Sequence, residues 1–138
     1  MLLQHLLDLL SEAFAGMQPD QPAPSNAWRA AMFVQACRLI SMQFGDPELR
    51  PDLLARQLEI STRMLHRIFA AHDETVMQHV LKERINRAAT LLASPQVRNR
   101  TITEVAFRCG FNNITHFGRV FDEQMGMTPS QWRRQKTI

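Results

Sequence analysis

The 138-residue sequence predicts an all-α fold. Helix start and stop signals divide most of the chain into helix-length segments, and apolar residues recur within them at helical spacing. The chain has only five glycines and few runs of β-branched residues, which favours helix over sheet. Hydrophobic residues make up 45% of the sequence, enough for a packed core. We therefore expect one domain, or two small subdomains that share a long helix.

Residues 1–17 are expected to form an amphipathic helix. Two acidic residues interrupt this segment and no lysine or arginine precedes its apolar run, which opposes a signal peptide. The run is also too short to cross a bilayer. A helix of this length cannot bury an apolar stripe alone, so it docks on its own domain, mediates dimerisation, or ends an upstream domain. The stripe, with its candidate dimerisation residues, consists of Leu3, Leu6, Leu7, Leu10 and Phe14.

A proline-rich linker is expected at residues 18–25, because proline at this density stops helices and favours an extended spacer. The remaining residues, 26–138, are expected to form a helical domain. Thr101 with Glu104, and Thr128 with Gln131, have the spacing of capping boxes, in which two side chains satisfy free backbone amides at a helix start. Breakers and caps predict helices over about 26–44, 51–58, 62–71, 75–93, 101–110, 113–125 and 129–136.

Two of these helix pairs have the pattern of a helix-turn-helix unit. The first covers about 51–71 and the second about 101–125, and the helix over about 75–93 links them. A short helix braced by a turn can hold a second helix in the major groove of DNA, so the repeat predicts a bipartite DNA reader. The units match in register at five pairs of positions: Ala55 with Ala106, Ile60 with Phe111, Leu65 with Phe117, Arg67 with Arg119, and Phe69 with Phe121.

The charge distribution agrees with a polyanionic partner. The formal net charge is +3, but residues 1–60 sum to −3 and residues 61–138 sum to +6. The basic part coincides with the helix-turn-helix patterns, as expected for a nucleic-acid-binding surface.

The two cysteines, Cys37 and Cys109, lie far apart and form neither a disulfide framework nor a paired metal spacing. This usage fits a reducing compartment, so we expect a cytoplasmic protein.

The sequence carries no motif that indicates an enzyme. A phosphate-cradling glycine loop, a nucleophile elbow and an HExxH zinc helix are all missing from it. We therefore expect no catalytic activity, no cofactor and no metal site. The five histidines fall in separate segments, at His5, His66, His72, His79 and His116.

Residues from about 33 to 134 resemble the C-terminal DNA-binding region of AraC/XylS-type transcriptional regulators. The specific part is ITEVAFRCGF, then HFxRVF, then GMTPSQWR, all between residues 102 and 133. The strings LLARQLEIS, LHRIF and ERINRAATLL, between residues 53 and 92, agree less strictly. The resemblance implies two helix-turn-helix subdomains joined by a central helix, with both recognition helices in successive segments of the major groove. It further implies a transcription regulator acting as an activator at promoter DNA, with RNA polymerase as a partner.

The chain departs from the family pattern at two customary glycines. Glu59 stands in the first turn, and Glu74 stands just after the helix over 62–71. Such glycines usually occupy left-handed backbone positions, where another residue costs roughly 1 kcal/mol. A shifted turn or lower stability of the first unit is therefore expected.

The expected linker helix has a length that suits two successive groove segments. About 19 residues at ~1.5 Å each give ~28 Å, against ~34 Å between successive major-groove faces. Arg84 and Arg87 on this helix either pair with acidic residues such as Glu83 or Glu104, or contact phosphate.

Base contacts are expected on the outward faces of the two recognition helices. Arginine can bind guanine O6 and N7, histidine can donate to a purine N7, and an exposed isoleucine fits a thymine methyl group. The alternative for each arginine is a solvated or phosphate-bound side chain. The candidate base-contact residues are Arg63, His66, Arg67, Ile114, Thr115, His116 and Arg119. Helix starts and the loop before residue 101 supply the candidate phosphate contacts, Thr62, Asn112, Asn113 and Arg100.

Two alternatives remain open on the sequence alone. The helical domain could bind another protein as an adaptor, in which case its binding would lack the salt dependence of phosphate neutralisation. The chain could also be a fragment that follows an upstream sensor and dimerisation domain, or a short stand-alone activator of the stress-response type. Reading the natural frame upstream of Met1 separates the latter two.

Overall fold

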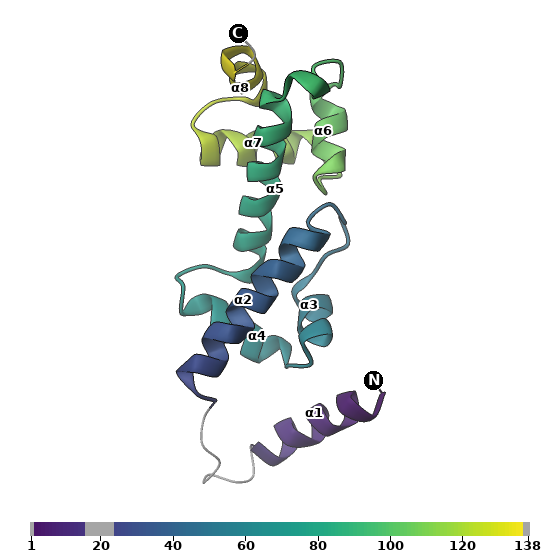
Figure 1. The fold of residues 1–138 in the computed structure, drawn as a ribbon, viewed down its shortest axis with the longest axis vertical. Coiled ribbons are helices and arrows are strands. Elements are labelled where there is room, and N and C mark those ends of the chain that lie inside the picture. The colour runs from purple at the N-terminus through teal and green to yellow at the C-terminus, as the bar shows by residue number, and fades with distance from the viewer. Residues whose placement is uncertain (1, 16–23, 137–138) are drawn as a thin grey trace. The chain divides into compact units, whose positions relative to one another are not determined.

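The computed structural model describes residues 2–15 and 24–136. These residues form eight α-helices and one short 3₁₀-helix, and no strand occurs among them (Figure 1). The all-α prediction is confirmed. The chain divides into two compact units: unit 1 comprises residues 1–40 and 49–77, and unit 2 comprises residues 41–48 and 78–138. Helices α2 (Asn26–Gln43) and α5 (Val76–Ala93) each contribute residues to both units.

Unit 1 contains α1 (Leu2–Ala15), most of α2, α3 (Pro51–Leu58), α4 (Thr62–Ala70) and the start of α5. The helix α4 buries one face because its apolar residues recur at helical spacing. The ring of Phe69 meets that of Phe33 edge-on at 5.1 Å between centroids, which ties α4 to α2. The buried residues of this unit are Ala36, Ile40, Leu49, Leu54, Ala55, Leu65, Ile68, Phe69 and Val76.

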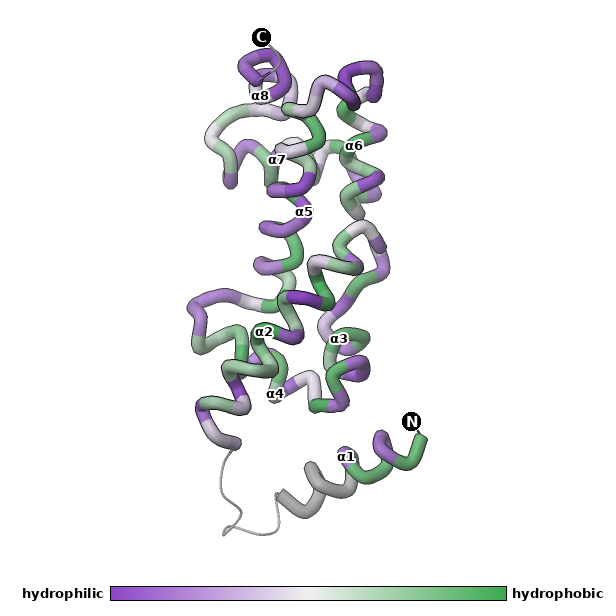
Figure 2. The backbone as a smooth tube through the Cα atoms, in the orientation of Figure 1, coloured by the Kyte–Doolittle hydropathy of each residue, from purple (hydrophilic) through white to green (hydrophobic). Residues whose placement is uncertain are grey.

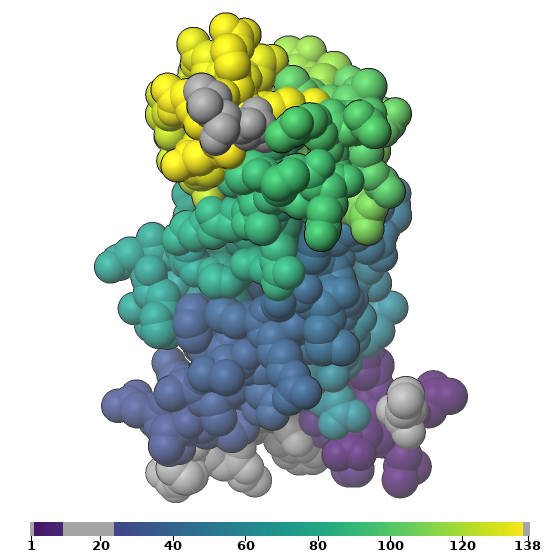
Figure 3. All heavy atoms as spheres, turned by 45° about the horizontal axis from the view of Figure 1, so that its top comes forward, coloured from purple at the N-terminus to yellow at the C-terminus, as the bar shows by residue number. Residues whose placement is uncertain are grey.

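Unit 2 contains the rest of α5, the 3₁₀-helix η1 (Pro95–Val97), α6 (Ile102–Arg108), α7 (Ile114–Met125) and α8 (Pro129–Lys136). The Trp132 indole donates a hydrogen bond of 2.9 Å to the Ala89 carbonyl and meets the Phe121 ring at 6.1 Å, which fixes α8 on α5 and α7. Figure 3 shows α8, in yellow, packed on the green helices of the same unit. The buried cluster is Ile85, Ala88, Ala89, Leu92, Val105, Ala106, Cys109, Phe111, Phe117 and Phe121.

Side-chain caps mark several of the helix starts. The side chains of Ser61, Thr101 and Asn113 accept hydrogen bonds from the third amide of α4, α6 and α7, at 2.9, 3.0 and 3.0 Å. Thr128 and Gln131 form the complete capping box of α8, with bonds of 2.9 and 3.2 Å in the two directions. The predicted bounds agree with the structure to within two residues, and only η1 lacked a predicted counterpart.

The predicted N-terminal helix is present as α1, with its leucines exposed. Leu3, Leu6 and Leu7 are 77%, 57% and 55% exposed. In Figure 2 hydrophobic and hydrophilic residues alternate along the coloured part of α1. The side chains of Leu10 and Phe14, residues 16 and 17 of the predicted helix, and residues 18–23 of the predicted linker lie outside the described part of the chain.

Neither a membrane span nor a metal cluster occurs among the described residues. None of their helices combines the length and hydropathy that crossing a bilayer requires. Histidine, cysteine and carboxylate side chains in this part of the chain do not gather in groups of three or more suited to a metal ion.

Candidate nucleic-acid interface

The turn between α3 and α4 is closed by backbone hydrogen bonds. After α3 ends at Leu58, Glu59 adopts a left-handed conformation with φ of 58°. The amide of Ile60 then donates to the Ala55 carbonyl at 3.0 Å, and the Glu59 amide donates to the Arg56 carbonyl at 3.2 Å. This arrangement satisfies free carbonyls at the end of α3 and directs the chain into α4. The turn therefore has ordinary left-handed geometry despite the missing glycine.

The turn between α6 and α7 has the same bonds around Gly110, whose φ is 93°. Phe111 donates to the Ala106 carbonyl at 3.0 Å, and Gly110 donates to the Phe107 carbonyl at 3.1 Å. A Cβ atom on Gly110 would clash with the Phe44 carbonyl oxygen and come within 2.6 Å of Nε of Arg84. Glycine is required here because the surrounding atoms leave no room for a side chain, and the positive φ angle favours glycine as well.

Arg84 supports this second turn from α5. It is only 5% exposed, and its guanidinium donates to the carbonyl oxygens of Phe44 and Asp46 at 2.8 Å each. Burial lowers the pKa of Arg84 below its ordinary value, and the charge of Asp46 opposes that shift. A buried side chain that donates inward has a structural role, so Arg84 does not contact phosphate. The sequence analysis predicted either an ion pair with Glu83 or Glu104 or a phosphate contact for Arg84. Both predictions are wrong, because its partners are two backbone carbonyls.

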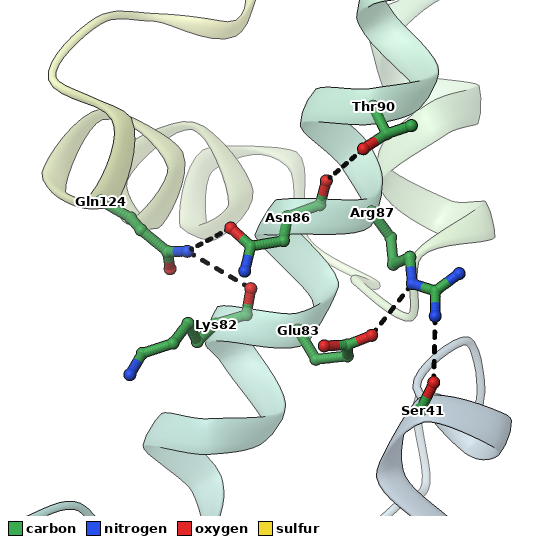
Figure 4. A network of polar contacts seen from close by, with 7 residues as sticks. All are labelled: Ser41, Lys82, Glu83, Asn86, Arg87, Thr90 and Gln124. Atoms are coloured by element: carbon green, nitrogen blue, oxygen red, sulfur yellow. Dashed lines mark hydrogen bonds and ion pairs between the residues drawn. The ribbon is translucent and has the colours of Figure 1, made fainter. Parts of the chain in front are cut away.

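Arg87, one turn beyond Glu83 on α5, belongs to a polar network on the surface of unit 2 (Figure 4). Its Nε lies 2.9 Å from the Glu83 carboxylate, its terminal nitrogen donates to the Ser41 hydroxyl at 3.0 Å, and its guanidinium lies 5.2 Å from the Phe44 ring. The ion pair predicted for Arg87 is therefore present.

In the same network the Gln124 amide donates to Asn86 at 3.1 Å and to the Lys82 carbonyl at 3.3 Å, which joins the end of α7 to α5.

The outward face of α4 carries three of the predicted base-contact residues. Arg63, His66 and Arg67 are exposed, whereas Leu65, Ile68 and Phe69 are buried. The two sets separate because residues three and four apart lie on one face of a helix. The predicted inward and outward residues of α4 are confirmed.

The outward face of α7 presents a different set. Ile114, Thr115 and Arg119 are exposed, and Ile114 retains 42% exposure despite its apolar side chain. His116 is only half-buried at the edge of this face, where its ring meets that of Phe111 at 5.7 Å. Packing against Phe111 gives His116 a structural role beside its predicted base contact. Phe117 and Phe121 are buried as expected.

The predicted phosphate-contact residues lie at or near helix starts. Asn112 is exposed immediately before Asn113, whose side chain caps α7, and Arg100 is exposed just before α6. Thr62, the first residue of α4, is half-buried. Since the side-chain oxygen of Asn113 already accepts the His116 amide, its amide nitrogen is the group available to an added acceptor.

The prediction of a left-handed position at Glu74 is wrong by one residue. Asp73 has φ of 58°, and Glu74 does not have a positive φ. The amides of Asp73 and Glu74 donate back to the carbonyls of Ala70 and Phe69, so the chain reverses at Asp73. Aspartate tolerates this conformation better than most residues.

Sequence reasoning missed the support provided by Arg84 and by Gln124. Both act on partners about forty positions away, so no local pattern indicates them. The glycine at position 110, followed by an apolar residue, was the available signal that something packs closely over the second turn.

These features define a class, that of proteins that present a helix on a helix-turn-helix scaffold. A family model described as "Helix-turn-helix domain" matches residues 54–135. The HTH-type transcriptional activator RhaR of Enterobacter sp. (strain 638) is 37% identical over 78 residues, which are 56% of this chain and 27% of RhaR. The chain thus matches about a quarter of the length of that curated relative.

Two solved structures share the fold at higher coverage. The C-terminal domain of AraT, a response regulator from Geobacillus stearothermophilus, is 28% identical with a TM-score of 0.71, covering 78% of this chain and 87% of that one. A regulator from Chromobacterium violaceum, described as an AraC-type DNA-binding domain-containing protein, is 27% identical with a TM-score of 0.72, covering 80% and 96%. The chain therefore belongs to the helix-turn-helix domain family, as an AraC/XylS-type DNA-binding domain of a transcription regulator.

Proposed function

We propose that this chain binds promoter DNA sequence-specifically through α4 and α7 and activates transcription there. The observation that carries the proposal is the repeated unit: each helix follows the same closed turn, buries its apolar face and exposes polar residues at matched positions. Counted from the caps Ser61 and Asn113, Arg67 and Arg119 occupy the same place on the exposed faces. An arginine on such a face suits guanine O6 and N7.

The proposed division of labour follows from exposure and chemistry. Arg63, His66 and Arg67 on α4, and Ile114, Thr115 and Arg119 on α7, are assigned to bases, with His116 at the margin. Residues at the helix starts and in the loop before α6 are assigned to phosphate, because backbone amides and long polar side chains there fix the orientation of a helix on DNA. These phosphate residues are Thr62, Asn112, Asn113 and Arg100.

The proposed partners extend beyond DNA. The RhaR relative is named a transcriptional activator, which supports activation. RNA polymerase as the partner and the cytoplasm as the compartment are further parts of the proposal. The exposed Leu3, Leu6 and Leu7 of α1 support self-association through that helix, with Leu10 and Phe14 as further members of the predicted stripe. Removing residues 1–24 is expected to reduce self-association while leaving DNA binding by the monomer intact.

The test is selection of bound duplexes from a random pool, repeated at two salt concentrations. We expect enrichment of a defined sequence, and an affinity whose logarithm falls against log salt with a slope of about −0.9 per neutralised phosphate. An adaptor that binds only proteins would enrich no sequence and show no such slope. Retention of all duplexes equally, with a steep slope, would contradict the assignment of bases to α4 and α7.

A further inference from the structure

Gly118 lies in the middle of α7, where glycine is a poor helix former. No special backbone conformation explains it, because Gly110 and Gly126 are the glycines with positive φ among the described residues. Crowding does not explain it either, since a Cβ atom on Gly118 would meet nothing within 4 Å beyond its chain neighbours and the backbone of its own helix. Within the described chain, nothing requires the residue to lack a side chain. Gly118 thus leaves a space on α7 that is open to a group approaching from outside.

The residues around Gly118 give this approach a chemical character. Ile114 lies one turn earlier on the same exposed face, and Thr115 lies beside it. Their side chains offer apolar carbon on two sides of the bare backbone at Gly118. Asp122, exposed one turn later, carries a negative charge that disfavours a phosphate at this place. The surface suits a small apolar group on a base edge better than the DNA backbone.

The matched position on α4 is occupied differently. Counted from the caps Ser61 and Asn113, the position of Gly118 corresponds to that of His66, an exposed ring. The first position after the cap, Thr62 on α4, corresponds to Ile114 on α7. The helix α4 therefore presents polar groups where α7 presents a bare and apolar patch, and the two helices cannot read the same base pair in the same way.

We propose that Gly118, Ile114 and Thr115 form a notch on α7 that receives the 5-methyl group of a thymine in the major groove. This inference rests on the proposed DNA binding and assigns one specificity determinant to it. Thymine is the base that carries a methyl group on its major-groove edge, so the notch selects one T·A pair by shape and apolar contact. A side chain at position 118 would fill the space that the methyl group occupies.

The experiment uses the full chain and a duplex obtained by selection, with each thymine replaced in turn by deoxyuridine. This replacement removes one methyl group and leaves every hydrogen-bonding group in place. At one thymine we expect the wild-type chain to lose about four-fold in affinity, the value of burying one methyl group. The Gly118→Ala variant is expected to lose about five-fold or more on the thymine duplex and distinctly less on the uracil duplex, because the clash with the methyl group is then absent.

Folding is controlled by thermal denaturation and by a second glycine. Gly118→Ala is expected to raise the midpoint of unfolding by several degrees, since alanine is the better helix former. Gly126→Ala, outside the notch, is expected to keep the full sensitivity to deoxyuridine. Equal loss of affinity by Gly118→Ala on both duplexes, or no loss on either, would overturn the notch while leaving sequence-specific binding intact. A wild-type chain that prefers no duplex over another would overturn the proposed function itself, before any variant is made.

Discussion

The two helix-turn-helix units share one turn geometry but satisfy it with different residues. In each, the amide after the left-handed residue donates to the carbonyl five positions earlier at 3.0 Å. The left-handed residue is Glu59 in the first unit and Gly110 in the second. The side chain of Glu59 is exposed, whereas Gly110 is buried against the Phe44 carbonyl and Arg84. A left-handed φ alone is thus compatible with glutamate, and close packing is what makes glycine necessary.

The largest effect is expected from Gly110→Ala. A left-handed alanine costs about 1–2 kcal/mol, and the clash with Phe44 and Arg84 adds about 1–3 kcal/mol. Urea denaturation should therefore show a loss of about 3 kcal/mol in the free energy of unfolding. Gly126→Ala is the matched control, because Gly126 also has a positive φ, 78°, but open space around it. A loss no larger for Gly110→Ala than for this control would contradict the packing explanation.

The next effect is expected from Arg84→Lys, which keeps the charge but not the fork that reaches two carbonyls. Leaving buried acceptors without donors should cost about 2 kcal/mol of unfolding free energy. Arg87→Lys is the control on the same helix, since Arg87 is exposed and its pair with Glu83 contributes less than about 1 kcal/mol. Similar losses for both variants would show that burial of Arg84 does not matter.

A third difference between the units is the pH dependence of stability. The second unit buries the titratable thiol of Cys109, whereas the matched position in the first unit is Leu58, which does not titrate. Burial raises the pKa of Cys109 from 9.0 to about 11. Between these values the unfolded chain loses the thiol proton while the folded chain keeps it, so stability falls as pH rises, by up to about 1.4 kcal/mol per pH unit. Unfolding measured from pH 8 to 11 should show this fall, and Cys109→Ala should flatten it. An unchanged slope in the variant would assign the fall to other groups.

The smallest effect is expected from Glu59→Gly, which relieves the left-handed position in the first turn. The folded state gains, and the more flexible unfolded chain offsets part of that gain, so stability should rise by roughly 0.5 kcal/mol. Thermal unfolding measures the change, with the exposed Gln57→Gly on α3 as a control that should destabilise. A fall in stability for Glu59→Gly would mean that the carboxylate makes a stabilising contact in the turn.

Local sequence signals predicted most of the helices, and they predicted which residues of the candidate site are buried and which are exposed. The proline at position 51 and the capping spacings at Thr101 and Thr128 predict helix starts correctly, because capping depends on residues three or four positions apart. Helical spacing likewise separated Leu65 from Arg67. These features depend on near neighbours, which the sequence displays directly.

Features that depend on distant partners could not be predicted. The sequence predicts an acidic partner or a phosphate for Arg84, because its true acceptors, the carbonyls of Phe44 and Asp46, lie 40 and 38 positions away. The contact of His116 with Phe111 depends on how the turn folds back. The left-handed residue after α4 is a different case, because the prediction of Glu74 followed the customary glycine position of the family, whereas the local preference of aspartate for this conformation indicates Asp73.

The central claim, that both units read bases through matched faces, is tested most directly by repeating the duplex selection with Arg67→Ala and with Arg119→Ala. Each variant is expected to lose about 1–3 kcal/mol of binding free energy and to relax base preference at one position. We expect the two relaxed positions to be different and to lie about 10 base pairs apart, one turn of DNA. Loss of affinity on all sequences alike in either variant, or relaxation at one shared position, would contradict the account.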